Sequence, residues 1–312
     1  MLSNVLQSNA SDRKKKPFNR VLLIMSSTGF DASAEERCMP SRWGFNLKGD
    51  SRIQRYLHLC DVQYKQANRS YSVEYVSYSE DERQGLNIMR SIQPHEDRNA
   101  ILVFVHGGYW IEGDRHMYNF IANGLHSHGI SVVSLGYRLA GKAEDLACCI
   151  DDVVAGIQKV QKTFPTSRIY LAGHSAGAHL ILNALRKLTT LEGICIVFCV
   201  SGIYSLQNIV NTSVGIKLQL DEDQARRFSV PPLDSCYTKA NIHIIVGQFD
   251  APEFHKQAQD LASSLQVRRC LPIPVQILPN EDHFSLIENL YFGDSALAQY
   301  IAQCDSQWRA AT

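Results

Sequence analysis

The sequence lacks an excess of charge, a long apolar run and a paired set of cysteines. Its 312 residues include 31 basic and 31 acidic side chains, so nothing predicts the basic surface of a nucleic-acid-binding protein. The longest apolar run, Ile194–Val200, is much shorter than the roughly 18 residues of a membrane span. The first residues lack the apolar core of a signal peptide. We therefore expect a cytoplasmic protein with no nucleic-acid or membrane partner.

The nine cysteines are scattered without a CxxC pair, which predicts reduced thiols in a chain with no recognisable signal peptide. The sequence also lacks the HxxxH and HExxH patterns that place metal ligands on one helix face. We therefore expect neither a metal nor another cofactor. A basic run, Arg13-Lys14-Lys15-Lys16, leaves a nuclear pool open. The oligomeric state is also open, with a homodimer as one option.

From residue 100 onward, short apolar runs alternate with helical patterns. The predicted strands lie at 100–105, 131–135, 168–172, 194–200, 242–246 and 274–278, and the helices at 116–127, 143–162, 177–188, 254–266 and 294–303. This alternation predicts the α/β class, with a mostly parallel central sheet covered by helices on both faces.

The rest of the chain is less regular. A helix is predicted at 53–65, and two early strands at 72–78 and 86–90. We predict that residues 1–16 form a disordered tail, that 17–312 form one domain, and that 205–236 form a small cap insertion.

A G-x-S-x-G motif, Gly173-His174-Ser175-Ala176-Gly177, stands between a predicted strand and a predicted helix. In this setting the serine occupies a sharp turn that exposes its hydroxyl above the sheet, as in the nucleophile elbow of α/β-hydrolases. The glycines allow strand and helix to crowd the turn. A serine in an ordinary glycine-rich loop is the alternative, and it is disfavoured by the flanking elements.

A second motif, His106-Gly107-Gly108-Tyr109-Trp110, follows the apolar run at 100–105. An HGG turn after a buried strand supplies backbone N–H groups to an oxyanion hole in lipases and esterases. We assign Gly107, Gly108 and Ala176 to that hole, and His106 to orienting the loop. Two motifs in the expected order predict an α/β-hydrolase fold.

The remaining catalytic groups follow later strands, in the order Ser, acid, His. Asp250 follows the strand at 242–246 and is the predicted acid, with Glu253 as its rival. His283 follows the strand at 274–278 and is the predicted base, because His255 falls within a helical pattern. We expect His174 and His179, which flank the nucleophile, to have supporting roles.

The motifs together resemble the kynurenine formamidase (arylformamidase) family. The resemblance is carried by the HGG-Tyr-Trp and G-x-S-x-G segments, by Val246 to His255, by Asp282 to Leu290 and by Pro40-Ser41-Arg42-Trp43. It spans residues 33–304. It implies hydrolysis of N-formyl-L-kynurenine to L-kynurenine and formate in tryptophan catabolism, by a cytosolic Ser-Asp-His enzyme without a cofactor.

Three features depart from the family pattern. Phe249 stands where a histidine is expected, Asn87 where an acidic residue is usual, and Tyr137-Arg138-Leu139 resembles the hormone-sensitive-lipase branch. None removes a catalytic group, but they leave the substrate preference open. We further hypothesise that Tyr109 and Trp110 form an aromatic wall around the reacting amide. The alternative for Trp110 is that it only packs under the loop.

Three other functions are alternatives. A general short-chain carboxylesterase shares the fold and triad. A non-catalytic hydrolase-fold interaction protein usually lacks its nucleophile or base, whereas Ser175, Asp250 and His283 are all present. A metal-dependent amidohydrolase would need a ligand cluster, and His174 and His179 are spaced unsuitably for a shared metal.

Hydrolytic activity should survive strong chelators and thiol reductants, because neither a metal nor a disulfide is predicted to take part. The check is the initial rate on phenyl acetate before and after prolonged incubation with EDTA or dithiothreitol. Activity that is lost to EDTA and restored by added metal would contradict the proposed chemistry.

Overall fold

The computed structural model describes residues 29–67, 71–91, 99–231, 240–269 and 273–312. The predicted tail at 1–16 lies outside these residues, as does the end of the predicted cap at 232–236. The described part of the chain contains no helix that is long and apolar enough to span a membrane.

Eight strands form one central sheet in the order β1-β2-β4-β3-β5-β6-β7-β8. They are β1 (Glu74–Ser77), β2 (Gly85–Met89), β3 (Ala100–Val105), β4 (Ile130–Leu135), β5 (Arg168–His174), β6 (Ile194–Val200), β7 (Asn241–Gly247) and β8 (Val275–Leu278). Strand β2 runs antiparallel to both of its neighbours, and the other pairings are parallel. The predicted mostly parallel sheet is confirmed.

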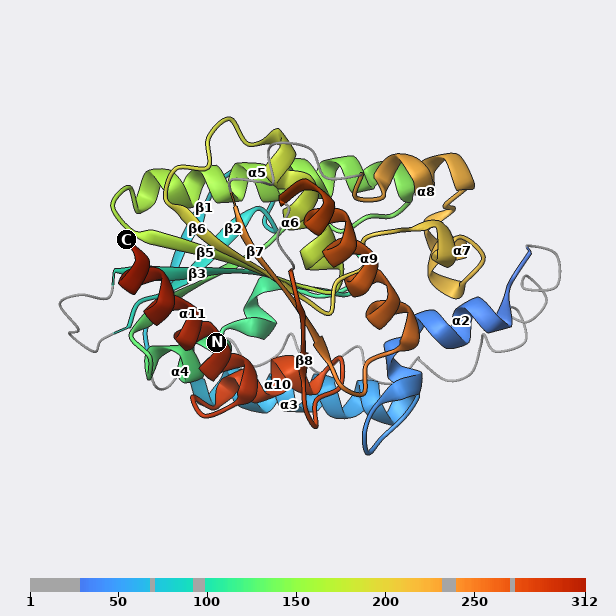
Figure 1. Cartoon of the computed structure of the whole chain (residues 1–312), viewed down its shortest axis with the longest axis horizontal. Helices are drawn as coiled ribbons and strands as arrows, with labels where there is room; N and C mark the ends of the chain where they lie inside the picture. The colour runs from blue at the N-terminus through green and yellow to red at the C-terminus, as the bar shows by residue number, and fades with distance from the viewer. Residues whose placement is uncertain (1–28, 68–70, 92–98, 232–239, 270–272) are drawn as a thin grey trace, which may run out of the picture.

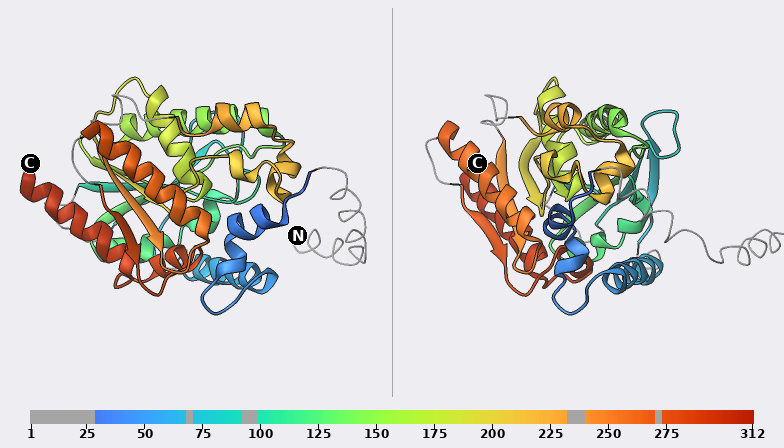
Figure 2. Two further views of the ribbon diagram at one scale, coloured as in Figure 1. Left: turned by 45° about the vertical axis from the view of Figure 1, so that its right-hand side comes forward. Right: turned by 90° about the vertical axis from the view of Figure 1, so that its right-hand side faces the viewer.

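Helices cover both faces of this sheet (Figures 1 and 2). The α-helices are α2 (Ala32–Cys38), α3 (Asp50–Ala67), α4 (Ile121–His126), α5 (Leu146–Thr163), α6 (Ala176–Lys187), α7 (Ser213–Leu218), α8 (Glu222–Phe228), α9 (Pro252–Arg269), α10 (Ser285–Glu288) and α11 (Ala296–Ala311). Short 3₁₀ turns are η1 (Pro40–Trp43), η2 (Arg115–Tyr118), η3 (Ala143–Asp145), η4 (Gln207–Ile209) and η6 (Asn289–Tyr291). Residues of α5, α6 and α9 share one core cluster, and residues of α3, α4 and α11 share the other.

Strand β3 shows why its sequence reads as an unbroken apolar run. All of its residues are buried, as expected for a parallel strand covered on both faces. Ile101, Val103 and Val105 belong to the cluster with α5 and α6. The alternate residues, such as Leu102 and Phe104, belong to the cluster with α3 and α4. Both faces of the sheet are therefore covered by packed side chains, so a substrate can reach it only where the strands end.

The structure differs from the sequence predictions at several helix ends, and it contains α2, α7, α8 and α10, for which no helix was predicted. The helix predicted at 116–127 is divided into the 3₁₀ turn η2 and α4. The side chain of Asp114 accepts the N–H of His116 and so begins the first turn earlier, as a 3₁₀ turn. The helix predicted at 294–303 continues to Ala311 as α11, beginning after Ser295, whose hydroxyl accepts the N–H of Ala298.

Helix α6 approaches β3 more closely than a side chain at position 177 would allow. A Cβ added to Gly177 would lie 2.0 Å from the carbonyl oxygen of Val105. The second glycine of the G-x-S-x-G motif therefore sets the separation of helix and strand just beyond Ser175.

Replacing Gly177 by alanine should reduce the free energy of unfolding by about 1–3 kcal/mol, the usual cost of overpacking a rigid core. Urea unfolding followed by circular dichroism measures the change. Gly141→Ala is the matched control, because its nearest neighbour to an added Cβ lies 3.4 Å away. Equal stability of the two variants would contradict the close-approach argument.

Candidate active site

The side chains predicted to carry chemistry gather at one edge of the sheet. His106, Ser175, Asp250 and His283 follow β3, β5, β7 and β8 in turn. These strands are parallel to one another, so their carboxyl ends meet at the same edge. Ligand sites of α/β proteins lie at this edge.

Ser175 occupies a strained turn between β5 and α6. Its backbone has φ 54° and ψ −118°, a conformation that non-glycine residues rarely adopt and that costs on the order of 1–3 kcal/mol. Its N–H donates to the carbonyl of Val200 at 2.9 Å. Ala176 is the first residue of α6, and N–H groups in a first helical turn have no acceptor within the helix.

Asp250 and His283 form a buried pair. Nδ1 of His283 lies 3.0 Å from Oδ1 of Asp250 and 3.3 Å from Oδ2. Both residues are about 4% exposed. Because Nδ1 faces the carboxylate, Nε2 is left on the opposite edge of the imidazole ring. This is the arrangement in which an acid fixes the tautomer of a histidine base.

Glu253, the rival acid, has other partners. Its Oε1 accepts hydrogen bonds from Asn208 and from Gln257, each at 2.8 Å. Glu253 therefore links α9 to the segment that carries η4. The imidazole of His283 is paired with Asp250 instead. His255, the rival base, lies in α9.

The loop after β3 lies directly against the Ser175 turn. A Cβ added to Gly107 would stand 3.0 Å from Cβ of Ser175, a contact so tight that the Ser175 turn would have to shift. Gly108 has φ +110°, a region that side chains disfavour. A side chain at either position would therefore disturb the loop beside the serine.

His106 supports this loop from beneath. Its Nδ1 lies 2.8 Å from the carbonyl oxygen of Gly107, and its ring stacks between Tyr118 and Tyr137. Burial lowers the pKa of His106 to about 4. The ring is therefore neutral at pH 7 and suits a structural role.

Tyr109 and Trp110 differ in burial and do not form one continuous aromatic wall beside Ser175. Both have positive φ angles, 48° and 62°. Trp110 is fully buried, and its indole N–H donates to Nδ1 of His179 at 3.1 Å. This burial does not support the predicted contact of Trp110 with substrate and matches the packing alternative. Tyr109 is partly buried, and its hydroxyl donates to the carbonyl of Cys38.

The two histidines beside the serine are buried connectors. Nε2 of His174 lies 2.9 Å from the carbonyl oxygen of His283, and the two rings are 4.5 Å apart. Nε2 of His179 lies 2.6 Å from the carbonyl oxygen of Phe228. Burial lowers the pKa of both histidines, that of His179 to about 4. His174 therefore ties the Ser175 turn to the His283 loop as a neutral ring.

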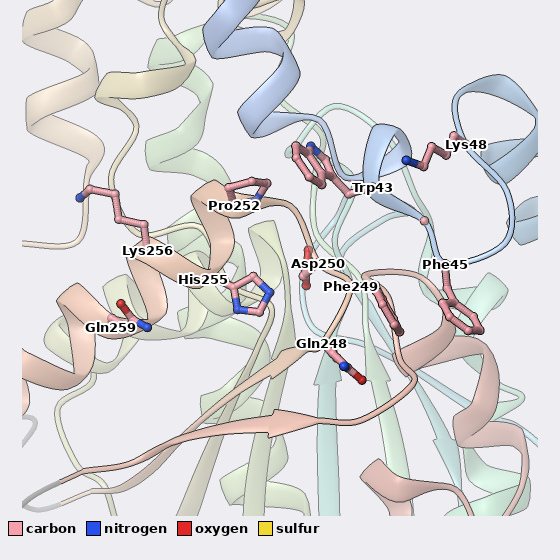
Figure 3. Close-up of a pocket in the computed structure, with 11 residues that line it drawn as sticks. Trp43, Phe45, Lys48, Gln248, Phe249, Asp250, Pro252, His255, Lys256 and Gln259 are labelled. Atoms are coloured by element: carbon pink, nitrogen blue, oxygen red, sulfur yellow. The ribbon is translucent and has the colours of Figure 1, made fainter.

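An open cleft of about 770 Å³ lies beside Asp250 (Figure 3). It is bordered by the N-terminal segment, by the turn after β7 and by the first part of α9. Phe249, one of the departures from the family pattern, stacks on Phe45 here with ring centroids 4.4 Å apart. Asn87, a second departure, is fully buried and bonded to Arg115 and Asn119, and it does not line this cleft.

Sequence reasoning did not single out Arg52, Asp282 or Glu288, which form a buried ion cluster around the His283 loop. Asp282 could have been suspected from its place next to His283. In the described part of the chain, no group of three or more His, Cys, Asp or Glu side chains is placed to hold a metal ion.

Comparison with known proteins agrees with this fold. A family model described as the alpha/beta hydrolase fold matches residues 102–219. The kynurenine formamidase of Salmo salar is 31% identical over 281 residues, which cover 86% of this chain and 94% of the relative. The chain belongs to the kynurenine formamidase family.

A second relative and a solved structure are also similar to this chain. The kynurenine formamidase of Danio rerio is 31% identical and covers 80% of this chain and 88% of its own length. A hyperthermophilic esterase from Pyrobaculum calidifontis is 15% identical, with a TM-score of 0.63, and covers 94% of this chain and 99% of that one. The second similarity concerns the fold alone.

Asp250→Asn should lower kcat on phenyl acetate by about 10⁴-fold, because an amide presents the wrong partner to Nδ1 of His283. Glu253→Gln should cost less than about tenfold, since its amide oxygen can still accept the hydrogen bonds from α9 and η4. Steady-state kinetics on both purified variants make the comparison. The opposite ranking would identify Glu253 as the acid.

Proposed function

We propose that this member of the family hydrolyses N-formyl-L-kynurenine to L-kynurenine and formate, with Ser175, Asp250 and His283 as its triad. The observation that carries the proposal is the buried His283–Asp250 pair beside a strained serine turn. Relatives named kynurenine formamidase, matched over most of the chain, support the choice of substrate.

In the first half-reaction, Nε2 of His283 takes the hydroxyl proton of Ser175 as Oγ attacks the formyl carbon. Asp250 stabilises the imidazolium that forms. The tetrahedral intermediate then collapses and breaks the carbon–nitrogen bond. His283 gives its proton to the departing aryl amine, which leaves as L-kynurenine, and the formyl group remains as an ester on Ser175.

In the second half-reaction, His283 deprotonates a water molecule that attacks the formyl ester. Formate leaves, and the proton on His283 returns to Oγ of Ser175. In both halves the negative charge on the carbonyl oxygen is held by the N–H groups of Gly107, Gly108 and Ala176. Loss of one such donor typically costs about 3–4 kcal/mol of transition-state stabilisation.

A formyl group carries only hydrogen on its carbonyl carbon, so this reaction needs almost no acyl pocket. The serine turn is closely surrounded: Ser175 is 2% exposed and Gly107 lies against it. Tyr109, fixed by its bond to the carbonyl of Cys38, is the aromatic side chain that we assign to the wall beside the reacting amide. Trp110 supports the loop from within the core.

A general short-chain carboxylesterase is the second candidate. Solved structures named esterases show that the same fold can carry this activity, although their similarity to this chain concerns the fold alone. Phe249, which stands where the family resemblance leads us to expect a histidine, leaves the substrate preference open. Both activities would use the same triad, so acyl-chain preference separates them.

Formylkynurenine should be cleaved far faster than acetylkynurenine, and kcat/KM for aryl esters should fall from acetyl to octanoyl. One or two extra methylenes in a rigid site cost about 1–3 kcal/mol, which is roughly 5- to 150-fold in rate. Kynurenine release and phenol release measure the two series. A specificity constant that rises toward octanoyl would favour the esterase.

Ser175→Ala is the control for both series. It should lower turnover by about three orders of magnitude or more, because the members of a triad act as a unit. Circular dichroism verifies that the variant is folded. A folded variant that keeps a tenth of the activity would remove Ser175 from its role.

A further inference from the structure

Arg52 lies deep in the protein, between two carboxylates that come from the other end of the chain. Its Nε and Nη2 donate to the two oxygens of Asp282 at 3.0 and 2.7 Å. Its Nη1 and Nη2 donate to the two oxygens of Glu288 at 2.7 and 3.1 Å. The guanidinium is thus held by two forked pairs, the strongest geometry for such bonds, and all three side chains are at most 6% exposed.

Asp282 immediately precedes His283, and its carboxylate organises the turn that carries the base. Oδ1 accepts the N–H groups of Phe284 and Ser285 at 2.9 and 2.8 Å. Oδ2 accepts the N–H of Phe45 at 3.1 Å. Burial alone would raise the pKa of Asp282, but the hydrogen bonds from Arg52 and from these backbone groups lower it below its ordinary value. The carboxylate therefore remains ionised and keeps all its donors at pH 7.

Phe284, the residue after His283, is held by α3, the helix that carries Arg52. The Phe284 ring lies over the guanidinium of Arg52, with 4.8 Å between the guanidinium carbon and the ring centroid. It also packs on Tyr56, one turn further along α3, with centroids 5.1 Å apart. Both neighbours of His283 are thus fixed to α3, while its carbonyl is held by His174.

The positive charge of Arg52 stabilises the turn that carries His283, because it neutralises two buried carboxylates. Without its guanidinium, the two buried carboxylates of Asp282 and Glu288 would face each other unpaired, next to the base. Two unpaired buried carboxylates repel each other and are strongly destabilised by the loss of their partner. We expect the turn to move so that water can reach them. The displacement would fall on the backbone of His283, because Asp282 is its direct neighbour.

From these contacts we propose that Arg52 is a positioning residue, which sets the location of the His283 imidazole through Asp282 and Glu288. The inference rests on the proposed role of His283 as the base. Arg52 touches neither substrate nor reacting atoms, so its effect is expected on the chemical step and not on substrate binding.

The test compares Arg52→Met and Arg52→Lys with Arg55→Met, an exposed arginine on the same helix. Arg52→Met should lower kcat on phenyl acetate about 100-fold, the cost of misplacing a catalytic group by about 1 Å, with KM within about threefold. Arg52→Lys should fall between this variant and the wild type, because it restores the charge without the fork. Arg55→Met should leave kcat unchanged.

A second readout is the rate at which a fluorophosphonate labels Ser175, measured per folded molecule at a temperature well below unfolding. It should fall in parallel with kcat. Unchanged kcat and labelling, with only a lower melting temperature, would overturn the proposal and leave Arg52 as a purely stabilising residue. If Arg52→Met does not fold, Arg52→Lys and Glu288→Gln decide on the same criterion.

These assays separate this inference from the proposed function. A wild-type enzyme that is labelled but does not cleave N-formylkynurenine would overturn the substrate assignment, and the Arg52 comparison on phenyl acetate would stand. A wild-type enzyme that is not labelled at Ser175 would overturn both.

Discussion

The backbone of Ser175 is the constraint on which the site depends. A positive φ at a non-glycine residue persists only where the surroundings fix it. Here the N–H of Ser175 is bonded to the carbonyl of Val200 in β6, and its carbonyl accepts the N–H of Ala178 in α6. Gly177 lets α6 press against β3. The strain is therefore borne by the sheet and its covering helix, and not by the loops that line the site.

The strands and the four residues that follow them could be predicted from the sequence, because each rests on local patterns. Buried parallel strands read as continuous apolar runs, and a turn motif then marks where each one ends. The prediction from sequence failed where a residue's role depends on contacts with residues far away in the chain. Helix α2 has only a short pattern, and Arg52 looks like any arginine on a helix until its carboxylates, 230 and 236 residues away, are placed beside it. The burial of Trp110 also depends on a partner in another element, His179.

The aromatic residues after the HGG turn illustrate the same point physically. Their positive φ angles would be unstable in an isolated loop. Each is held by one hydrogen bond from its side chain, Trp110 to His179 in α6 and Tyr109 to the carbonyl of Cys38 at the end of α2. These two side chains thus shape the loop that faces Ser175. Tryptophan and tyrosine are needed there for the N–H and the hydroxyl that make these bonds as much as for the size of their rings.

It follows that the N-terminal segment is bonded to the loops that carry the proposed catalytic residues. The carbonyl of Cys38 accepts the hydroxyl of Tyr109 and so holds the glycine loop. The N–H of Phe45 and the guanidinium of Arg52 bind Asp282 and so hold His283, the proposed base. One short stretch of chain therefore reaches both sides of the serine. The sheet and α6 hold the turn of Ser175, whereas the glycine loop and the loop of His283 are both bonded to a segment outside the sheet. Changes in this segment can thus alter the chemistry without touching any of the strands.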